Sequence, residues 1–509
     1  LPADPPRIQE GQIMNSQPTV LTRSIDLALS PEEVFDNLHR MPGFFFLDSG
    51  MAGHELSRYS YVGVNPFLTL RSRGDGIDII EGKKIEHRRG NPLEVLAATL
   101  NRMRISGGSP LIPFAGGGVG TFSYELGAFT QEMTLEAENT LGLPDMVVSF
   151  YKTLLAYEHD TKRWIGASVE LTGGRGTTVR KRLGNDIEKL KELALKPHRG
   201  TATVATATPD DEETMVLPVV TEAKSVTLDG VNVQTTMTRE EYLAAVRRIQ
   251  EHIAAGDIYQ ANLTQRWSTP FSGDPGELYK ALRQASPAPY GLYMNTGESI
   301  IAGSSPECFL NLTGRSLETR PIKGTRRRGE TPEADAQLRA ELEASAKDKA
   351  ELTMIADLER NDLGRVCETG SVTVKELHRL ESFANVHHLV SVVQGELRPG
   401  VDFAELMKAT FPSGSITGAP KKRAMQILDQ TEGTARGPYT GAMGYLGYDG
   451  SLSLNVAIRT LVLTQGVCHL GVGSGIVADS NPEAEYDECV AKARGMLAAL
   501  AASQSAAVS

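Results

Sequence analysis

The amino-acid sequence predicts an α+β fold divided into two lobes. The chain has 509 residues, which is enough for roughly two to four compact units. Short β-like runs alternate with helix-like runs along most of it. From Pro197 to about Gln234 this alternation gives way to weakly patterned Thr, Ala, Val, Pro and acidic residues. We therefore expect four segments: a loose N-terminus (1–20), an N-terminal lobe (21–199), a linker or extended crossing (200–236) and a C-terminal lobe (237–505).

The composition is that of an ordinary globular protein. Apolar residues make up 40% of the sequence and charged residues 23%, and no apolar run is long enough to span a bilayer. The formal net charge of -11 argues against a nucleic-acid or anionic-membrane surface, since both need basic patches. The four cysteines are far apart and form no CxxC pair, which disfavours a zinc cluster or a disulfide framework. We expect a cytoplasmic protein that binds neither nucleic acid nor membrane.

Local patterns predict individual elements in order along the chain. The apolar run Phe44–Leu47 is too short for a signal peptide and predicts a buried strand. Val147–Tyr157 is strand-like, and the charged stretch Asp186–Leu195 is helix-like. Thr238 has Glu241 three residues on, followed by apolar residues at helical spacing, so a helix with a capping box is expected to open the second lobe.

A last helix is expected after residue 481. Ser480 and Glu483 have capping-box spacing. Glu485, Glu488 and Lys492 stand at i, i+3 and i+7, so all three can project from one helix face. Acidic residues in a first helical turn usually only complement the helix dipole. The spacing of these three charges favours a further role in binding.

Several motifs in the second lobe occur in an order that is similar to that of the chorismate-utilising enzymes. They are Ser304-Ser305-Pro306-Glu307, Pro321-Ile322-Lys323-Gly324-Thr325, the stretch that follows Glu351, and Glu485 to Glu488. The similarity runs from Gly256 to Lys492 and is weaker in the first lobe. A lysine is usually a solvated charge. In this context, Lys323 points to the aminodeoxychorismate synthase branch of the family, since the other branches typically carry a small residue there.

The resemblance implies a fold and a ligand set. The fold is the two-lobed anthranilate-synthase-like one, with packed, mostly antiparallel β-sheets and outer helices. Mg²⁺ would be held by Glu351, Glu485 and Glu488, which are hard oxygen ligands of the kind that it prefers. Chorismate carries two carboxylates, so the site also needs positive charge. The remaining substrate-binding residues implied by the family are Arg459 in an apolar strand-like run, Tyr439, Lys492, Thr325, Gln260 and the amides of a glycine-rich turn (Gly473, Ser474, Gly475).

The implied chemistry assigns roles to three residues. Glu307 would be the general acid for the departing 4-hydroxyl, with a pKa raised by burial beside apolar neighbours. His388 would position or polarise the substrate, although a lone histidine is often structural. Lys323 would attack C2, after which ammonia adds at C4 and expels it.

The ammonia must come from elsewhere, because no cysteine lies in the Gly-x-Cys-x-Gly elbow of a glutamine amidotransferase. A separate amidotransferase partner is therefore implied, and the product would be 4-amino-4-deoxychorismate, the precursor of p-aminobenzoate and folate. Two alternatives stay open. One is the large subunit of an anthranilate synthase, and the other is a non-catalytic regulatory subunit that binds tryptophan.

A tryptophan pocket is implied for the first lobe. Its candidate residues are Leu47, Asp48, Ser49, Arg58 and Tyr59. The matching region forms a feedback pocket in anthranilate synthases and holds a structural tryptophan in the aminodeoxychorismate branch. The Leu-Leu-Glu-Ser of the anthranilate type is absent here, which argues against feedback regulation.

Overall fold

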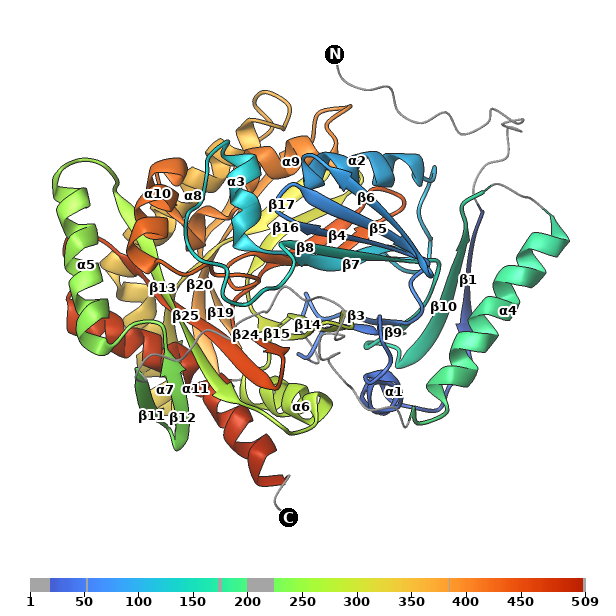
Figure 1. The fold of residues 1–509 in the computed structure, drawn as a ribbon, viewed down its shortest axis with the longest axis horizontal. Coiled ribbons are helices and arrows are strands. Elements are labelled where there is room, and N and C mark those ends of the chain that lie inside the picture. The colour runs from blue at the N-terminus through green and yellow to red at the C-terminus, as the bar shows by residue number, and fades with distance from the viewer. Residues whose placement is uncertain (1–18, 52–53, 173–175, 199–223, 384, 507–509) are drawn as a thin grey trace.

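A computed structural model describes residues 19–51, 54–172, 176–198, 224–383 and 385–506. In this part of the chain the strands form two sheets, of 13 and 12 strands, whose strand pairs are all antiparallel. Helices cover the outer faces (Figure 1). The α+β class and the antiparallel sheets predicted from the sequence are confirmed.

The first sheet runs in the order β1 (Thr19–Ile25), β10 (Arg163–Glu170), β9 (Thr153–Glu158), β3 (Tyr59–Gly63), β2 (Phe45–Asp48), β14 (Tyr290–Asn295), β15 (Ile300–Ser305), β24 (Thr460–Thr464), β25 (Val467–Ile476), β13 (Gln260–Pro270), β12 (Val231–Thr235) and β11 (Ser225–Leu228), with β21 (Gly418–Ala419) also on β13.

The second sheet runs in the order β18 (Ile322–Arg327), β20 (Val386–Glu396), β17 (Ser316–Arg320), β16 (Cys308–Thr313), β23 (Leu452–Val456), β22 (Ala442–Gly447), β7 (Gly117–Phe122), β8 (Met146–Tyr151), β4 (Leu68–Arg73), β5 (Gly76–Glu81) and β6 (Lys84–Arg89), with β19 (Thr373–Ser382) also on β20.

The helices are α1 (Pro31–Leu38), α2 (Pro92–Arg102), α3 (Gly127–Thr130), α4 (Thr177–Ala194), α5 (Arg239–Ala254), α6 (Pro275–Ala285), α7 (Pro332–Ala344), α8 (Ala346–Gly364), α9 (Phe403–Thr410), α10 (Lys421–Glu432) and α11 (Pro482–Ala506), with short 3₁₀ turns η1 (Tyr124–Leu126) and η2 (Gly414–Ile416).

The core has three main layers. One apolar cluster joins the first sheet to α1, α4, α5, α6, α10 and α11. A second joins the second sheet to α2, α8 and α9. A third, which includes Phe45, Tyr151, Leu292 and Met443, lies between the two sheets. Because this inner layer draws on strands of both sheets, the sheets are packed face to face as a sandwich.

Both sheets contain strands from both predicted lobes. In the first sheet β2 pairs with β14, and in the second β7 pairs with β22. The division into lobes at residues 199 and 237 therefore does not separate the sheets from one another. The two-lobe division stays a prediction. Most of the expected linker and most of the expected loose N-terminus lie outside the described residues.

Several local predictions are confirmed and one is corrected. Thr238 caps α5 through a complete capping box with Glu241. The last part of the expected linker is instead a hairpin, β11 and β12, at the edge of the first sheet. Val231 and Val233 are buried in the core and alternate with exposed polar residues. This period of two is typical of a half-buried strand.

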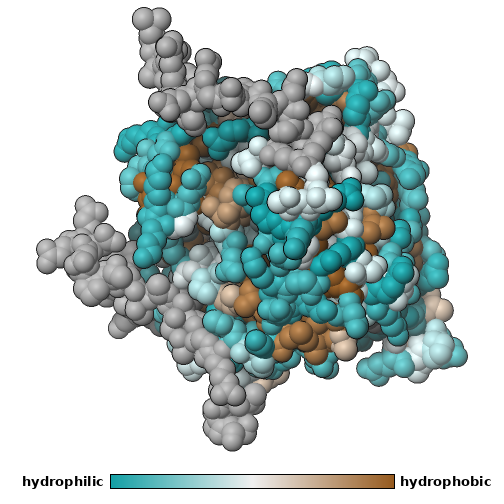
Figure 2. Space-filling model, turned by 90° about the vertical axis from the view of Figure 1, so that its right-hand side faces the viewer, coloured by the Kyte–Doolittle hydropathy of each residue, from teal (hydrophilic) through white to brown (hydrophobic). Residues whose placement is uncertain are grey.

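The face of the molecule on the side of α4 is mainly polar (Figure 2). Figure 2, which views the molecule from the side of α4 and β10, shows hydrophilic residues over most of this face, with smaller hydrophobic areas between them. Within the described residues, no helix is both long enough and apolar enough to cross a membrane.

Candidate active site

Glu307 and Arg459 lie on two neighbouring connections between the sheets. Glu307 falls between β15 of the first sheet and β16 of the second, and Arg459 between β23 and β24, which return in the opposite direction. Backbone hydrogen bonds tie the two crossings together, from Val456 N to Glu307 O and from Ser304 N to Arg459 O, both at 3.0 Å. The strand expected around Arg459 is interrupted there, and Arg459 has a left-handed backbone with φ of 49°.

Glu307 is a buried carboxyl group. Only 4% of the residue is exposed, and this burial raises its pKa to about 7, although the Ser415 hydroxyl, the Lys323 charge and the Ile322 amide act to lower it. Its Oε1 has no hydrogen-bond partner within the described residues. Because a buried, unpaired carboxylate is costly, Glu307 retains a proton near neutral pH and can donate it. The burial expected from the sequence is thus present.

Arg459 is a cation without a carboxylate partner in the described part of the chain. Its Nη1 donates to Ser286 Oγ at 3.4 Å, and burial lowers its pKa to about 10. Buried guanidinium groups normally pair with carboxylates, because desolvating an isolated charge is expensive. Arg459 is therefore available to bind an anionic ligand with two parallel hydrogen bonds.

Lys323, Glu351 and Gln260 converge beside Gly475. Lys323 lies on β18, next to a bulge at Gly324, and its Nζ forms an ion pair of 2.9 Å with Glu351 Oε1 from α8. A Cβ atom at Gly475 would lie 3.1–3.3 Å from Glu351 Oε1, Gln260 Nε2 and Lys323 Nζ. Both amide atoms of buried Gln260 lack a partner within the described residues. Because position 475 carries no side chain, these three polar groups converge on the space that a Cβ atom would occupy.

His388 lies across the ladder from Thr325. Its Nδ1 is 2.8 Å from Thr325 Oγ1, and its Nε2 has no partner among the described residues. Burial, and then the positive charge of Arg459, lower the pKa of His388 to about 3. The imidazole is therefore neutral at physiological pH, with one nitrogen occupied by Thr325 and the other able to hydrogen bond a ligand.

The backbone of β25 provides an unpaired edge. On β13, Thr264 lies opposite Gly473 of β25, and Asn262 lies opposite Gly475. The N–H groups of Thr264 and Asn262 point away from β25 and donate to Glu432 and Thr417. In an antiparallel ladder these are non-hydrogen-bonded pairs, so the amides of both glycines point to the other edge. Neighbouring β24 pairs with β25 only as far as Leu470. The prediction of a glycine-rich turn is therefore wrong, because this segment is part of a strand. The amides of Gly473 and Gly475 are nevertheless directed to the edge where they can bind an anion.

Three further predicted residues surround this edge. Lys492 Nζ donates to Gly473 O at 3.0 Å and pairs with Glu488 at 2.7 Å. The ring of Tyr439 lies over Gly471, where a Cβ atom would come within 2.1 Å of it. Ser474 differs from the other two, because its hydroxyl lies 2.9 Å from Tyr242 OH, on the buried side of the strand. Ser474 therefore supports the site and does not line it.

The predicted metal carboxylates are only partly assembled. Glu485 is buried, accepts from Ser480 Oγ at 2.7 Å, and has a pKa raised by burial and by Glu488. Burial also acts to raise the pKa of Glu488, but Lys492 and Lys323 lower it overall. Within the described residues, no group of three or more His, Cys, Asp or Glu is close enough to hold a metal ion. The three candidate donors are nevertheless all carboxylates, which are ligands that a hard cation prefers. A cation would also relieve the repulsion between the charges of Glu485 and Glu488.

The start of α11 corrects one prediction. The capping box expected between Ser480 and Glu483 is not formed, because the Ser480 hydroxyl binds Glu485 and the Val477 amide instead. Asn481 Oδ1 accepts from Ala484 N at 3.1 Å and caps the helix. Ser480 thus holds a candidate ligand, a role that capping-box spacing did not reveal.

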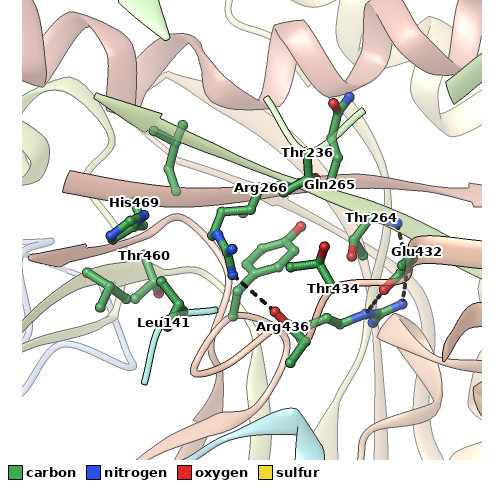
Figure 3. A pocket seen from close by; sticks show the side chains of 15 residues that line it. Leu141, Thr236, Thr264, Gln265, Arg266, Glu432, Thr434, Arg436, Thr460 and His469 are labelled. Carbon is green, nitrogen blue, oxygen red and sulfur yellow. Dashed lines mark hydrogen bonds and ion pairs between the residues drawn. The ribbon is translucent and has the colours of Figure 1, made fainter. Parts of the chain in front are cut away.

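A small cavity lies behind Tyr439. Its volume is about 20 Å³, roughly the space of one water molecule. Figure 3 shows Glu432, Thr434 and Arg436 around it, and Gln265 directed away. None of the three predicted catalytic residues lines it.

A larger cavity of about 160 Å³ lies between the sheets. All five residues predicted for a tryptophan pocket line it, together with Tyr61, Tyr290, Tyr445 and Asn455 among others. Asp48 takes part through its backbone, because its carboxylate points to α6, where it binds Tyr279 OH and Arg283 Nε. The Asn455 amide donates to Tyr290 O at 2.9 Å and leaves buried Oδ1 without a partner in the described part of the chain.

Two buried residues near Glu307, Ser415 and Glu359, gave no signal in the sequence. The Ser415 hydroxyl acts to lower the pKa of the Glu307 carboxyl group. Glu359 on α8 is fully buried and is close enough for the charge of Glu307 to raise its pKa. An acidic residue among the charged residues of α8 gave no signal of burial, because the helix has buried and exposed faces that only packing distinguishes.

Comparisons with known proteins agree with this geometry. Residues 44–498 match the family model of chorismate binding enzymes. The chain is 36% identical to aminodeoxychorismate synthase component 1 of Escherichia coli (strain K12), over 92% of this chain and 95% of that protein. It is 38% identical to an anthranilate synthase component 1 of Haloarcula marismortui, over 82% of each. The crystal structure of anthranilate synthase component I from Streptococcus pneumoniae superposes with a TM-score of 0.71 at 29% identity, covering 86% and 92%.

Proposed function

Because the chain belongs to the family of chorismate binding enzymes, we propose that it aminates chorismate at C4, as an aminodeoxychorismate synthase component 1 does. The observation that carries this proposal is the position of Lys323. Its Nζ reaches the face of Gly475 beside Glu351, at a point where a small residue would leave space for water or ammonia. A primary amine there favours covalent catalysis over direct addition at C2.

In the proposed mechanism the chain's own residues bind, orient and move protons. Arg459 and the amides of Gly473 and Gly475 hold the substrate carboxylates. Lys323 attacks C2 while Glu307 protonates the oxygen that leaves C4 as water. Ammonia then adds at C4 and expels Lys323 as a neutral amine. The ring nitrogen of His388 that lacks a partner hydrogen bonds to the substrate and orients it.

Glu351, Glu485 and Glu488 would hold Mg²⁺ in this proposal. A bound cation would neutralise a substrate carboxylate and compete with the Lys323 ammonium for Glu351. Glu488→Gln is expected to raise the Mg²⁺ concentration for half-maximal activity about tenfold or more. A Mg²⁺ titration of activity measures this, with Glu483→Gln on the exposed side of α11 as the control. An unchanged titration would remove Glu488 from the ligand set.

The ammonia is proposed to come from a separate glutamine amidotransferase subunit. All four cysteines are buried and unpaired, and burial raises the pKa of Cys367 to about 11 and of Cys308 and Cys489 to about 12. None is therefore suited to be the thiolate nucleophile of glutamine hydrolysis. Ammonium salts should replace the partner in vitro.

Anthranilate synthesis is the second candidate, because relatives of both names match the chain at similar identity. Product analysis separates the two. The purified chain is incubated with chorismate, Mg²⁺ and ammonium at mildly alkaline pH, and an aminodeoxychorismate lyase is added to half of the sample. We expect p-aminobenzoate only with the lyase. Anthranilate formed without the lyase would show amination at C2 and overturn the proposal.

We also infer that the 160 Å³ cavity binds tryptophan. Tyrosine rings supply apolar walls, and Asn455 Oδ1 is a buried acceptor that still needs a donor such as the indole N–H. Tryptophan at 100 times its Kd should raise Tm by about 2–4 °C in differential scanning fluorimetry. Equal shifts with leucine and tryptophan would contradict this inference.

A further inference from the structure

A chain of hydroxyl groups connects Glu307 to a second buried carboxyl group. Glu359 Oε1, on α8, accepts from Ser413 Oγ at 3.0 Å and from Gly414 N at 3.1 Å. The hydroxyls of Ser413 and Ser415 are 3.0 Å apart, and the Ser415 hydroxyl is close enough to the carboxyl group of Glu307 to lower its pKa. Hydrogen bonds thus lead from Glu359 through Ser413 to Ser415, whose hydroxyl acts on the carboxyl group of Glu307.

The charges around this chain favour a proton held between the two carboxyl groups. Burial raises the pKa of both to about 7, and each also retains one buried oxygen without a partner among the described residues. Lys323 and Lys492 face Glu307 from the cleft. Asp362 and Lys421 face Glu359, but the Lys421 ammonium is bound directly to Asp362 at 2.7 Å and to Thr410 O at 2.6 Å.

We propose that Glu359 is a proton reservoir that recharges Glu307 through Ser413 and Ser415. The proposal rests on the proposed function only in that Glu307 acts as the acid for the C4 oxygen. When Glu307 gives its proton to that oxygen, the Ser415 proton moves to Glu307, the Ser413 proton to Ser415, and the Glu359 proton to Ser413. The proton that ammonia loses on adding at C4 returns by the same route in the opposite direction. No electrons move between groups, and no co-reactant is needed.

Glu359 and the serines do not contact substrate, so they are positioning residues in this scheme. A purely structural role would be enough to explain Ser413 as a hydrogen-bond donor to a buried carboxylate. Two features exceed it. Serine hydroxyls both donate and accept, so the chain works in either direction. It also ends on the one carboxyl group that the chemistry discharges in every turnover.

The test measures chorismate consumption, in the full-length chain with Mg²⁺ and ammonium. Ser413→Ala removes one oxygen of the chain and leaves both carboxyl groups. We expect kcat to fall about tenfold with KM unchanged, a part of the 10²–10⁴-fold that general acids contribute. Ser413→Thr keeps the hydroxyl and should retain wild-type kcat. Thr410→Val is the matched control, because its buried hydroxyl donates to Leu406 O and lies outside the chain.

Glu359→Gln supplies a second readout. It keeps an acceptor for Ser413 but removes the proton store and a negative charge. A nearby negative charge raises the pKa of a carboxyl group. Without the charge of Glu359, the pKa of Glu307 should fall, and the alkaline limb of the kcat profile should move to lower pH. Equal losses in Ser413→Ala and Ser413→Thr, or wild-type kcat and pH profile in Ser413→Ala and Glu359→Gln, would overturn the reservoir. Product identity tests the proposed function separately, since the C4 oxygen leaves in both candidate reactions.

Discussion

The proposed catalytic site and the larger cavity differ in how their charged groups are paired. In the cleft, Arg459 has no carboxylate partner and Gln260 has an unpaired amide, within the described residues. Beside the cavity, Arg58 pairs with Glu158 at 3.0 Å, and hydrogen bonds from Thr161 and Arg58 lower the pKa of Glu158 to about 2. A folded protein satisfies its buried polar groups unless a ligand completes them. The proposed catalytic site therefore leaves a buried cation unpaired, whereas the cavity pairs its cation and leaves the uncharged Asn455 Oδ1 without a partner in the described part of the chain.

Removal of Lys323 should have the largest effect, because it deletes the proposed nucleophile. Lys323→Ala is expected to reduce p-aminobenzoate formation in the lyase-coupled assay on the order of 10³-fold or more. The exposed residue Lys375 on β19 offers a matched control, as Lys375→Ala removes the same charge outside the cleft. The tryptophan-induced rise in Tm should be unchanged in both variants. Unaltered amination at C4 in Lys323→Ala would exclude the covalent mechanism.

Substitution of Glu307 should alter both rate and pH dependence. The protonated form is the active one, so activity should fall as the pH rises through the raised pKa of about 7. Glu307→Gln should lower kcat about 10²–10³-fold and abolish this alkaline limb. The measurement is kcat for chorismate consumption between pH 5.5 and 9. A limb that persists in Glu307→Gln would assign it to another group.

Arg459 and Arg58 form a matched pair that tests the comparison directly. Arg459→Lys keeps the charge but loses the planar donor pair, and its KM for chorismate should rise about 10–100-fold. Arg58→Lys should leave KM unchanged, since its guanidinium is committed to Glu158 outside the cleft. Steady-state kinetics at saturating Mg²⁺ distinguish them. Similar KM values for all three proteins would show that Arg459 does not bind the substrate.

The smallest effect is expected at the cavity. Tyr59→Ala removes one aromatic wall and the bond from Tyr59 OH to Glu158. It should abolish the tryptophan-induced rise in Tm and change kcat/KM less than about twofold, because surface-side substitutions away from the cleft are mild. A loss of activity that tryptophan restores would instead show that the two regions are coupled.

Local sequence signals predicted those features that depend on neighbouring residues. The capping box at Thr238 needs only Glu241, and the spacing of Glu485, Glu488 and Lys492 needs only one helix. The prediction failed where a partner lies far away. Gly473 to Gly475 resemble a turn in sequence, yet their conformation is set by pairing with β13, some 200 residues earlier. The burial of Glu359 was not predicted, because its hydrogen-bonding partner Ser413 comes from a segment 54 residues later.

The sequence by itself determined which chemical groups the protein has and where its helices begin, because both depend on residues within one or two turns of each other. Only the tertiary structure decided which of these groups are unpaired. Within the described residues Arg459 has no carboxylate partner, and the pKa of Glu307 is raised to about 7, because two adjacent crossings between the sheets removed both side chains from water. Burial and pairing are properties of the packed assembly, and they set the pKa values on which the chemistry depends.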